Sequence, residues 1–127
     1  MPEFIFFIWK LRNSEDSLTP ARFQKFLKSC ETYIRKLEED GKLISAQPIE
    51  WKGKIISVTS QDWTDVPFNE AGEVIGGYYH IRAKDLDDAI EIAKANPEFE
   101  YNPDVRIEVR PIKVKEESTE FTYPTSM

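Results

Sequence analysis

The first apolar run of the chain is continuous rather than alternating. Residues 4–9 read Phe-Ile-Phe-Phe-Ile-Trp, so every position is aromatic or β-branched. That pattern is typical of a strand covered on both faces. We therefore expect a central strand near the N-terminus.

Apolar positions next recur at three- and four-residue steps, which predicts a helix. Thr19 offers an N-cap hydroxyl and Pro20 suits the first helical position. Gly41 is expected to end the helix as a left-handed C-terminal cap. The predicted core stripe consists of Phe23, Phe26, Leu27, Cys30, Ile34 and Leu37.

The middle of the chain reads mostly as extended structure. Residues 42–49 predict a second strand, and 51–59 predict an extra β arm with its turn at Gly53. Residues 61–72 are rich in Asp, Asn, Pro and Gly and predict a loop. β character returns over 73–83, which we expect to be a third core strand.

The last third predicts one more helix and one more strand. Asp85 can cap the helix, and Asn96-Pro97 is expected to end it. The apolar stripe of this helix is Leu86, Ala89, Ile90 and Ala93. Residues 104–110 alternate, with Val105, Ile107 and Val109 on one face and Arg106, Glu108 and Arg110 on the other.

The order strand, helix, strand, strand, helix, strand is that of a ferredoxin-like split βαβ domain. We predict an α+β domain over residues 1–112, with an antiparallel sheet, two helices on one sheet face and the extra β arm. The other face would stay open unless a second copy covers it, which favours a homodimer. The polar tail, 113–127, is expected to be disordered or to pack on the partner subunit.

Two short motifs resemble the YCII-related family, in the branch named for an Asp-Gly-Pro-Phe motif. Residues 64–70 read Thr-Asp-Val-Pro-Phe-Asn-Glu, and 76–79 read Gly-Gly-Tyr-Tyr. The likeness covers roughly residues 3–112 and implies a dimeric α/β barrel built from ferredoxin-like protomers. Val66 stands where the motif has glycine. Some relatives are thought to use a His on the first helix with an Asp near the end of the second, but Cys30 and Asn96 occupy those places here.

Composition narrows the classes of partner. A net charge of −6 and a pI near 4.9 disfavour nucleic acid and membrane surfaces. Cys30 is the only cysteine, so no internal disulfide forms, and no metal-binding spacing is present. The apolar run at 4–9 is too short to cross a membrane and lacks the features of a secretion signal. These features predict a cytoplasmic protein with no metal and no cofactor.

The candidate chemistry centres on His80, the only histidine. Alternation from Tyr78 places His80 on the face of Arg82, opposite Ile75, Gly77, Tyr79 and Ile81. In the functional interpretation His80 exchanges protons in a dimer cleft. Substrate-binding groups for an organic anion there would be Arg82, Tyr78, Arg106, Arg110 and Glu108. In the structural interpretation, which the pattern favours, His80 and the arginines form ion pairs with Glu108.

Two further features have the same double meaning. Asp65 is a candidate proton acceptor, but a lone loop Asp is more often a turn former. Gly76-Gly77 in mid-strand indicates a β-bulge or a close backbone approach.

Two hypotheses of function follow. The first is a homodimer that binds a small organic anion, with His80 and Asp65 as tentative acid–base groups. The second is a noncatalytic accessory or regulatory module that docks another protein. Relatives of this branch are sometimes encoded beside, or fused to, sigma factors of the extracytoplasmic-function type, which gives one example of such a partner. The sequence does not decide whether the chain is an enzyme.

Overall fold

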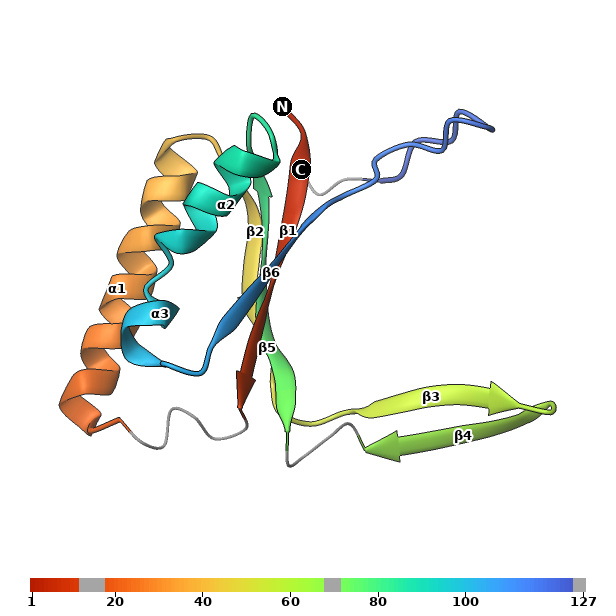
Figure 1. Ribbon diagram of the computed structural model, residues 1–127, viewed down its shortest axis with the longest axis horizontal. Helices are drawn as coiled ribbons and strands as arrows, with labels where there is room; N and C mark the ends of the chain where they lie inside the picture. The colour runs from red at the N-terminus through yellow and green to blue at the C-terminus, as the bar shows by residue number, and fades with distance from the viewer. Residues whose placement is uncertain (12–17, 68–71, 125–127) are drawn as a thin grey trace.

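The computed structural model describes residues 1–11, 18–67 and 72–124 (Figure 1). The elements in chain order are β1 (Glu3–Leu11), α1 (Pro20–Glu39), β2 (Leu43–Pro48), β3 (Lys54–Thr59), β4 (Asp62–Pro67), β5 (Glu73–Arg82), α2 (Leu86–Lys94), α3 (Glu98–Tyr101) and β6 (Arg106–Pro111). The sequence motif at 64–70 continues past β4 into residues 68–70, which lie outside the described residues.

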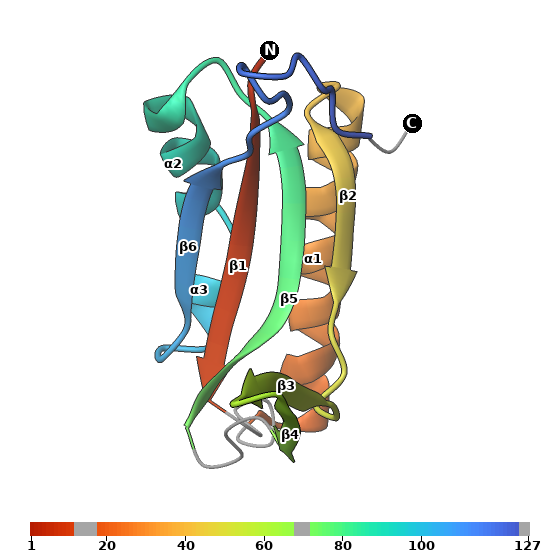
Figure 2. The same ribbon diagram turned by 90° about the vertical axis from the view of Figure 1, so that its right-hand side faces the viewer.

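The main sheet has the strand order β2-β5-β1-β6, and each neighbouring pair is antiparallel. The helices cover one face of this sheet and leave the other, the open face, toward the viewer in Figure 2. This order, with β1 central, is that of a ferredoxin-like α+β domain, as predicted. Among the described helices, none is long and apolar enough to cross a membrane.

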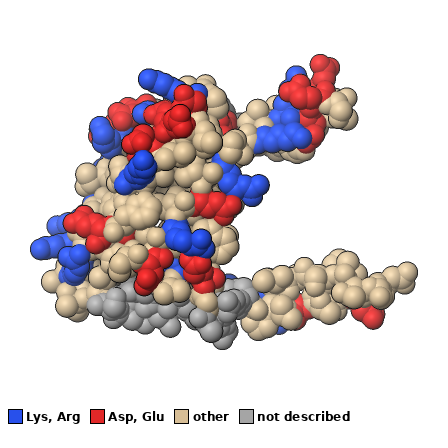
Figure 3. All heavy atoms as spheres, viewed as in Figure 1, with Lys and Arg blue, Asp and Glu red and all other residues tan. Residues whose placement is uncertain are grey.

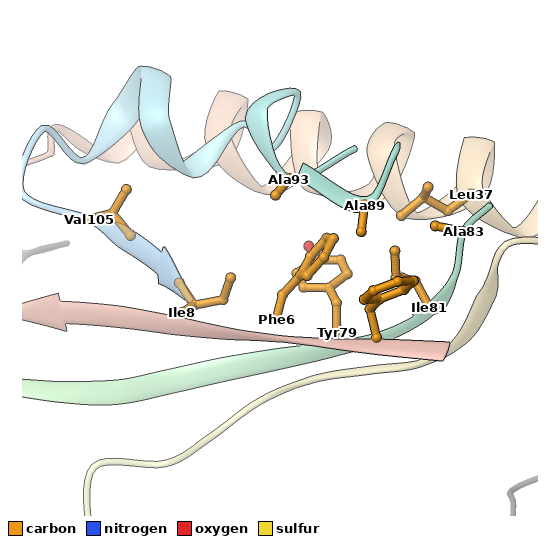
Figure 4. Packing of buried hydrophobic residues seen from close by; sticks show 10 residues of the cluster. Phe6, Ile8, Leu37, Tyr79, Ile81, Ala83, Ala89, Ala93 and Val105 are labelled. Carbon is orange, nitrogen blue, oxygen red and sulfur yellow. The ribbon is translucent and has the colours of Figure 1, made fainter. Parts of the chain in front are cut away.

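The hydrophobic core lies between the sheet and the helices (Figure 4). Alternate residues of β1, namely Phe4, Phe6 and Ile8, are almost fully buried there, and they pack with Leu37 of α1 and Ala89 of α2. The intervening residues of β1 are only partly buried. The continuous apolar run therefore places apolar side chains on both faces of the sheet. Within the described chain, helices cover only one of these faces.

Helix ends follow the predicted caps. The Thr19 side chain accepts a hydrogen bond from the Arg22 amide at 3.1 Å, and Asp85 accepts one from the Asp88 amide at 2.8 Å. Gly41 adopts the left-handed conformation at φ 70° just past α1. The single-turn helix α3, which follows Asn96-Pro97, was not predicted.

The β arm differs from its prediction in extent and in the position of its turn. The turn lies at Ser60-Gln61, whose φ angles are 50° and 73°, and not at Gly53. Positive φ at both central residues is the geometry of a tight two-residue hairpin turn. Residues 62–67, predicted as loop, thus form β4, because they pair along their length with 54–59.

A β-bulge in β5 shifts the predicted faces of that strand. Ile8 pairs with Gly77 and Trp9 with Ile75, so Gly76 has no partner in β1. This confirms the bulge predicted from Gly76-Gly77. The extra residue reverses the alternation, so Ile75 lies on the open face with His80, and its predicted place on the opposite face was wrong.

The segment after β6 folds back on itself within the described residues. Lys115 and Thr122 form an isolated β-bridge, and the Tyr123 amide donates to the Val114 carbonyl at 2.9 Å. This small hairpin projects from the sheet on the same side as the β arm, at the opposite end (Figure 1). Its packing on a partner subunit stays a prediction.

Candidate functional site

A pocket of about 400 Å³ lies between the first half of α1 and the strands β2 and β5. We name it the α1 pocket. Its walls are mainly apolar and include Phe23, Phe26, Leu27 and Ile34 of α1. A concave, mostly apolar site with a few polar groups is the usual form of a small-molecule site.

A buried ion pair lies among the residues that line this pocket. Lys10 Nζ is 2.9 Å from Glu98 Oε2, and the two side chains are only 8% and 10% exposed. The ammonium also lies 5.5 Å from the centre of the Phe26 ring. Desolvation of two charges is costly and the attraction between them does not reliably repay it. Stabilisation of the fold is therefore a weak explanation for this buried ion pair.

Local structure explains how these two charges meet. Lys10 continues the helix-facing set of β1 after Ile8, so its side chain points beneath α1. Gly76 makes room for it, because a Cβ at position 76 would lie 3.1 Å from Lys10 Cδ. At Gly76 the close approach is thus by a side chain, that of the chain's own lysine, whereas the backbone that comes close to the glycine pair is that of Gln47 at Gly77.

Glu98 is held from its other side by two asparagines. The Asn102 Nδ2 donates to Glu98 Oε1 at 2.7 Å, and the Glu98 amide donates to Asn96 Oδ1 at 2.9 Å. Asn96 Nδ2 is buried and makes no hydrogen bond of normal geometry within the described residues. The carboxylate is consequently fixed in orientation.

Two weaker acids adjoin the ion pair. Burial raises the pKa of the Cys30 thiol to about 11, and the nearby Glu98 carboxylate adds to the effect. Burial also raises the pKa of Tyr79, whose hydroxyl lies near Asn96. Both groups are therefore neutral at pH 7. Cys30 is a poor nucleophile there, but it lines the pocket and is more than core filler.

Apart from Asp65, the residues predicted as a site lie on the open face, and of these Tyr78 also lines the α1 pocket. His80 Nε2 is 2.7 Å from Glu3 Oε1, so its partner is Glu3 and not the predicted Glu108. The Tyr78 hydroxyl is 3.0 Å from the Ser45 hydroxyl. Arg82 follows on the same face of β5, two residues beyond His80.

The β6 residues of the predicted site form a second group on this face. Arg106 Nε donates to Glu73 Oε2 at 2.8 Å, and hydrogen bonds from Arg106 lower the pKa of Glu73. Glu108 accepts a hydrogen bond from Trp9 Nε1 at 2.9 Å and lies 3.9 Å from Arg110. These polar groups flank a partly exposed apolar stripe on β1 and β5, which consists of Ile5, Phe7, Trp9 and Ile75.

Asp65 is not brought to His80. It lies in β4 of the arm, where its carboxylate is 3.6 Å from Lys54 Nζ and largely exposed. The arm leaves the sheet near Glu73, and His80 is seven residues further along β5, a separation of roughly 23 Å along the strand. The structure also corrects the interpretation of Asp65 as a turn former, because Asp65 is a strand residue.

Lys10, Glu98 and Asn102 were missed from the sequence. The available signal was a lysine in the helix-facing phase of an otherwise apolar strand, which is where a charge needs a buried partner. Its partner is 88 residues away in the chain, on a one-turn helix that periodicity does not reveal. Among the described residues, no group of three or more His, Cys, Asp or Glu side chains is arranged to hold a metal ion.

The fold and the pocket together define a ferredoxin-like α+β domain with a single layer of helices over one sheet face. The model of the YCII-related domain matches residues 5–114. The chain therefore belongs to the YCII-related family, as its two motifs predicted. No curated protein matches it.

Two residues singled out in the sequence lie at or beside the α1 pocket. Cys30 and Asn96 were matched to the His and Asp of some relatives only through the resemblance, and that correspondence stays a prediction. Cys30 lines the pocket, and Asn96 is hydrogen-bonded to the Glu98 backbone beside it. Both residues thus lie beside the Lys10–Glu98 pair.

Proposed function

We propose that this chain is a homodimeric binding protein for a small organic anion, and that the anion lies in the α1 pocket with its charged group at Lys10. The observation that carries the proposal is the buried Lys10–Glu98 pair in a mainly apolar pocket, whose other polar lining residues include Glu31 and Gln47. Strongly desolvated charges in a cleft mark functional sites more often than they mark stability.

The pocket chemistry selects the class of ligand. A lysine ammonium donates to several acceptors, so a carboxylate or phenolate oxygen can join or replace Glu98 around Nζ. The apolar walls from α1 suit an aromatic or branched aliphatic body. A small carboxylate with one ring satisfies both requirements.

The homodimer in this proposal is supported by the open face. Its apolar stripe of Ile5, Phe7, Trp9 and Ile75 is only partly buried within the described chain. The surrounding Glu3, His80, Glu73 and Arg106 carry both signs of charge, which suits a symmetric contact of a surface with itself. In this arrangement His80 and Arg82 are interface residues, in line with the structural interpretation of that face.

The test is a panel of aromatic and aliphatic carboxylates, read by thermal unfolding and by titration calorimetry. A ligand at 100 times its Kd should raise the free energy of unfolding by about 2.7 kcal/mol. The double variant Lys10→Met with Glu98→Gln should bind the best ligand at least about tenfold more weakly, since one charge-assisted hydrogen bond is lost.

Two control variants locate the site. His80→Ala should keep the parent's affinity, and so should Lys36→Met, which removes an exposed lysine of α1. The proposal fails if no panel member binds. It also fails if His80→Ala abolishes binding while the double variant retains it, because the ligand would then lie on the open face.

A further inference from the structure

The β3–β4 hairpin, which we call the arm, extends away from the domain as a free two-stranded ribbon. Its strands pack mainly against each other, from the pair Lys54–Pro67 at its root to Thr59–Asp62 at its tip. An isolated two-stranded hairpin is at best marginally stable in water. The arm therefore needs a surface outside this chain's own described residues to stabilise it.

The side chains of the arm show what kind of surface that is. One face presents Ile56, Val58 and Trp63, which are 67%, 55% and 75% exposed. The other face presents Ile55 and Val66, each more than half exposed. Figure 3 shows the arm as mostly uncharged, in contrast to the domain body. Exposed apolar residues gathered on one projection are typical of a protein contact site.

The direction of the arm identifies its partner. The arm projects from one end of the sheet, on the side away from the helices, and the hairpin of residues 113–124 projects on that side from the other end (Figure 1). Any molecule seated on the open face lies between these two projections. Six residues of strand reach about 20 Å, which exceeds the spacing of about 10 Å between packed sheets. The arm therefore extends beyond the first layer of a molecule seated there.

We infer that the arm is a clasp for a second copy of this chain, and this inference rests on the homodimer of the proposed function. In a twofold dimer each arm crosses the flank of the other subunit. The apolar face of Ile56, Val58 and Trp63 is then buried in both arms. The interface then consists of the open face and two exchanged arms.

A hollow at the root of the arm continues the open face toward it. This hollow has a volume of about 470 Å³ and is lined by Phe7, Trp9 and Ile75 of the sheet and by Ile49 and Ile55 at the arm. The apolar residues of the sheet stripe, the hollow and the arm thus follow one another along a bent surface. The charged residues Glu50, Lys52, Lys54 and Glu73 also line the hollow. Such a bent surface is complementary in shape to the edge of a second domain. A flat partner would contact only part of it.

The test compares the parent with the triple variant Ile56→Ser, Val58→Ser and Trp63→Ser by sedimentation over nanomolar to micromolar concentrations. We expect the dimer dissociation constant to rise by at least about 100-fold, as for loss of a central aromatic anchor. The control variant carries Leu86→Ser and Phe99→Ser, which remove exposed apolar side chains of the helix layer. It should dimerise like the parent.

A second measurement does not depend on how the triple variant folds. With Trp9→Phe and Trp51→Phe, Trp63 is the only tryptophan. Because Trp9 lies on the open face, sedimentation first checks that this variant dimerises, and iodide should then quench Trp63 poorly in the dimer and several-fold better after dilution to monomer. A parent that sediments as a monomer overturns both the homodimer and the clasp. A parent dimer that the triple variant leaves intact, with Trp63 open to iodide, overturns the clasp alone.

Discussion

Lys10 occupies a position where an apolar residue would pack without difficulty. Its neighbours in the helix-facing phase of β1 are all large and apolar, and Phe26 lies over its ammonium. The charge is accommodated only because Glu98 meets it and Gly76 leaves space for its stem. Each of these residues is therefore constrained by the other two.

We expect the two members of this pair to be strongly coupled. Lys10→Met alone strands a buried carboxylate and should lower the free energy of unfolding by about 3–5 kcal/mol. Glu98→Gln alone should cost a similar amount, because it leaves the ammonium unpaired. The double variant should return to within about 1 kcal/mol of the parent, since no buried charge remains.

Chemical denaturation at pH 7 measures all four proteins of this cycle. The glutamine at position 98 keeps an oxygen for the Asn102 hydrogen bond, so the charge is the main change there. If the losses in free energy of unfolding of the two single variants simply add in the double variant, Lys10 and Glu98 are not coupled. The buried geometry of the pair is then wrong.

Cys30 should react as a buried thiol. Its pKa of about 11 means that the thiolate is a small minority at pH 7. The rate of alkylation by iodoacetamide should therefore climb about tenfold per pH unit between pH 7 and 9.5 without a plateau. Glutathione, measured alongside, should level off near its ordinary thiol pKa. A plateau for Cys30 near pH 8.5 would show that the thiol is exposed.

The same raised pKa affects stability. The folded state favours the protonated thiol, so this contribution is fully present below the ordinary thiol pKa. It is lost as the pH rises from there through about 11. Circular dichroism over the alkylation range is thus the check that the protein remains folded.

At the scale of elements, the two adjacent glycines of β5 pack closely against two different neighbours. A Cβ on Gly77 would lie 3.1 Å from the Gln47 carbonyl oxygen, which belongs to the backbone of β2. The atoms nearest to a Cβ on Gly76 would belong to the side chain of Lys10. The backbone of β2 is displaced less easily than the flexible side chain of Lys10.

Gly77→Ala should therefore destabilise the domain more than Gly76→Ala. Overpacking costs about 1–3 kcal/mol, and reduced freedom of the unfolded chain returns about 0.4–1 kcal/mol, so we expect a net loss near 1 kcal/mol at position 77. Gly76→Ala should change the free energy of unfolding very little. Thermal and urea unfolding distinguish the two, and a reversed order would mean that β2 yields more readily than Lys10.

Elements governed by local signals were predictable from the sequence. Thr19, Gly41 and Asp85 act through hydrogen bonds and backbone angles within a few residues, and each has its predicted role. The arm was partly missed because its turn uses Ser60-Gln61, a pair without the glycine that usually marks such turns. The one-turn α3 is too short to show a period.

For the whole molecule, the order of elements was enough to predict the ferredoxin-like topology, because few connections of that order are sterically sensible. The candidate site was not predictable in the same way. Lys10 and Glu98 are brought together by the complete fold, and no pattern within either segment pairs them. The surface around His80, chosen from strand alternation, includes Ile75 and pairs His80 with Glu3, both against prediction, and Asp65 lies apart from it in the arm.

The bulge at Gly76 makes the length of β5 as important as its composition. On one side of the extra residue, odd-numbered positions face away from the helices, and on the other side even-numbered positions do. If this residue were kept but the strand paired regularly, without a bulge, the faces of everything before it would be exchanged. Val74 would then turn to the solvent, Ile75 would turn inward, and Glu73 would swing out of reach of Arg106. A relative that lacks the extra residue would present the same two surfaces without a bulge, because Ile75 and Gly77 already pair with successive residues of β1.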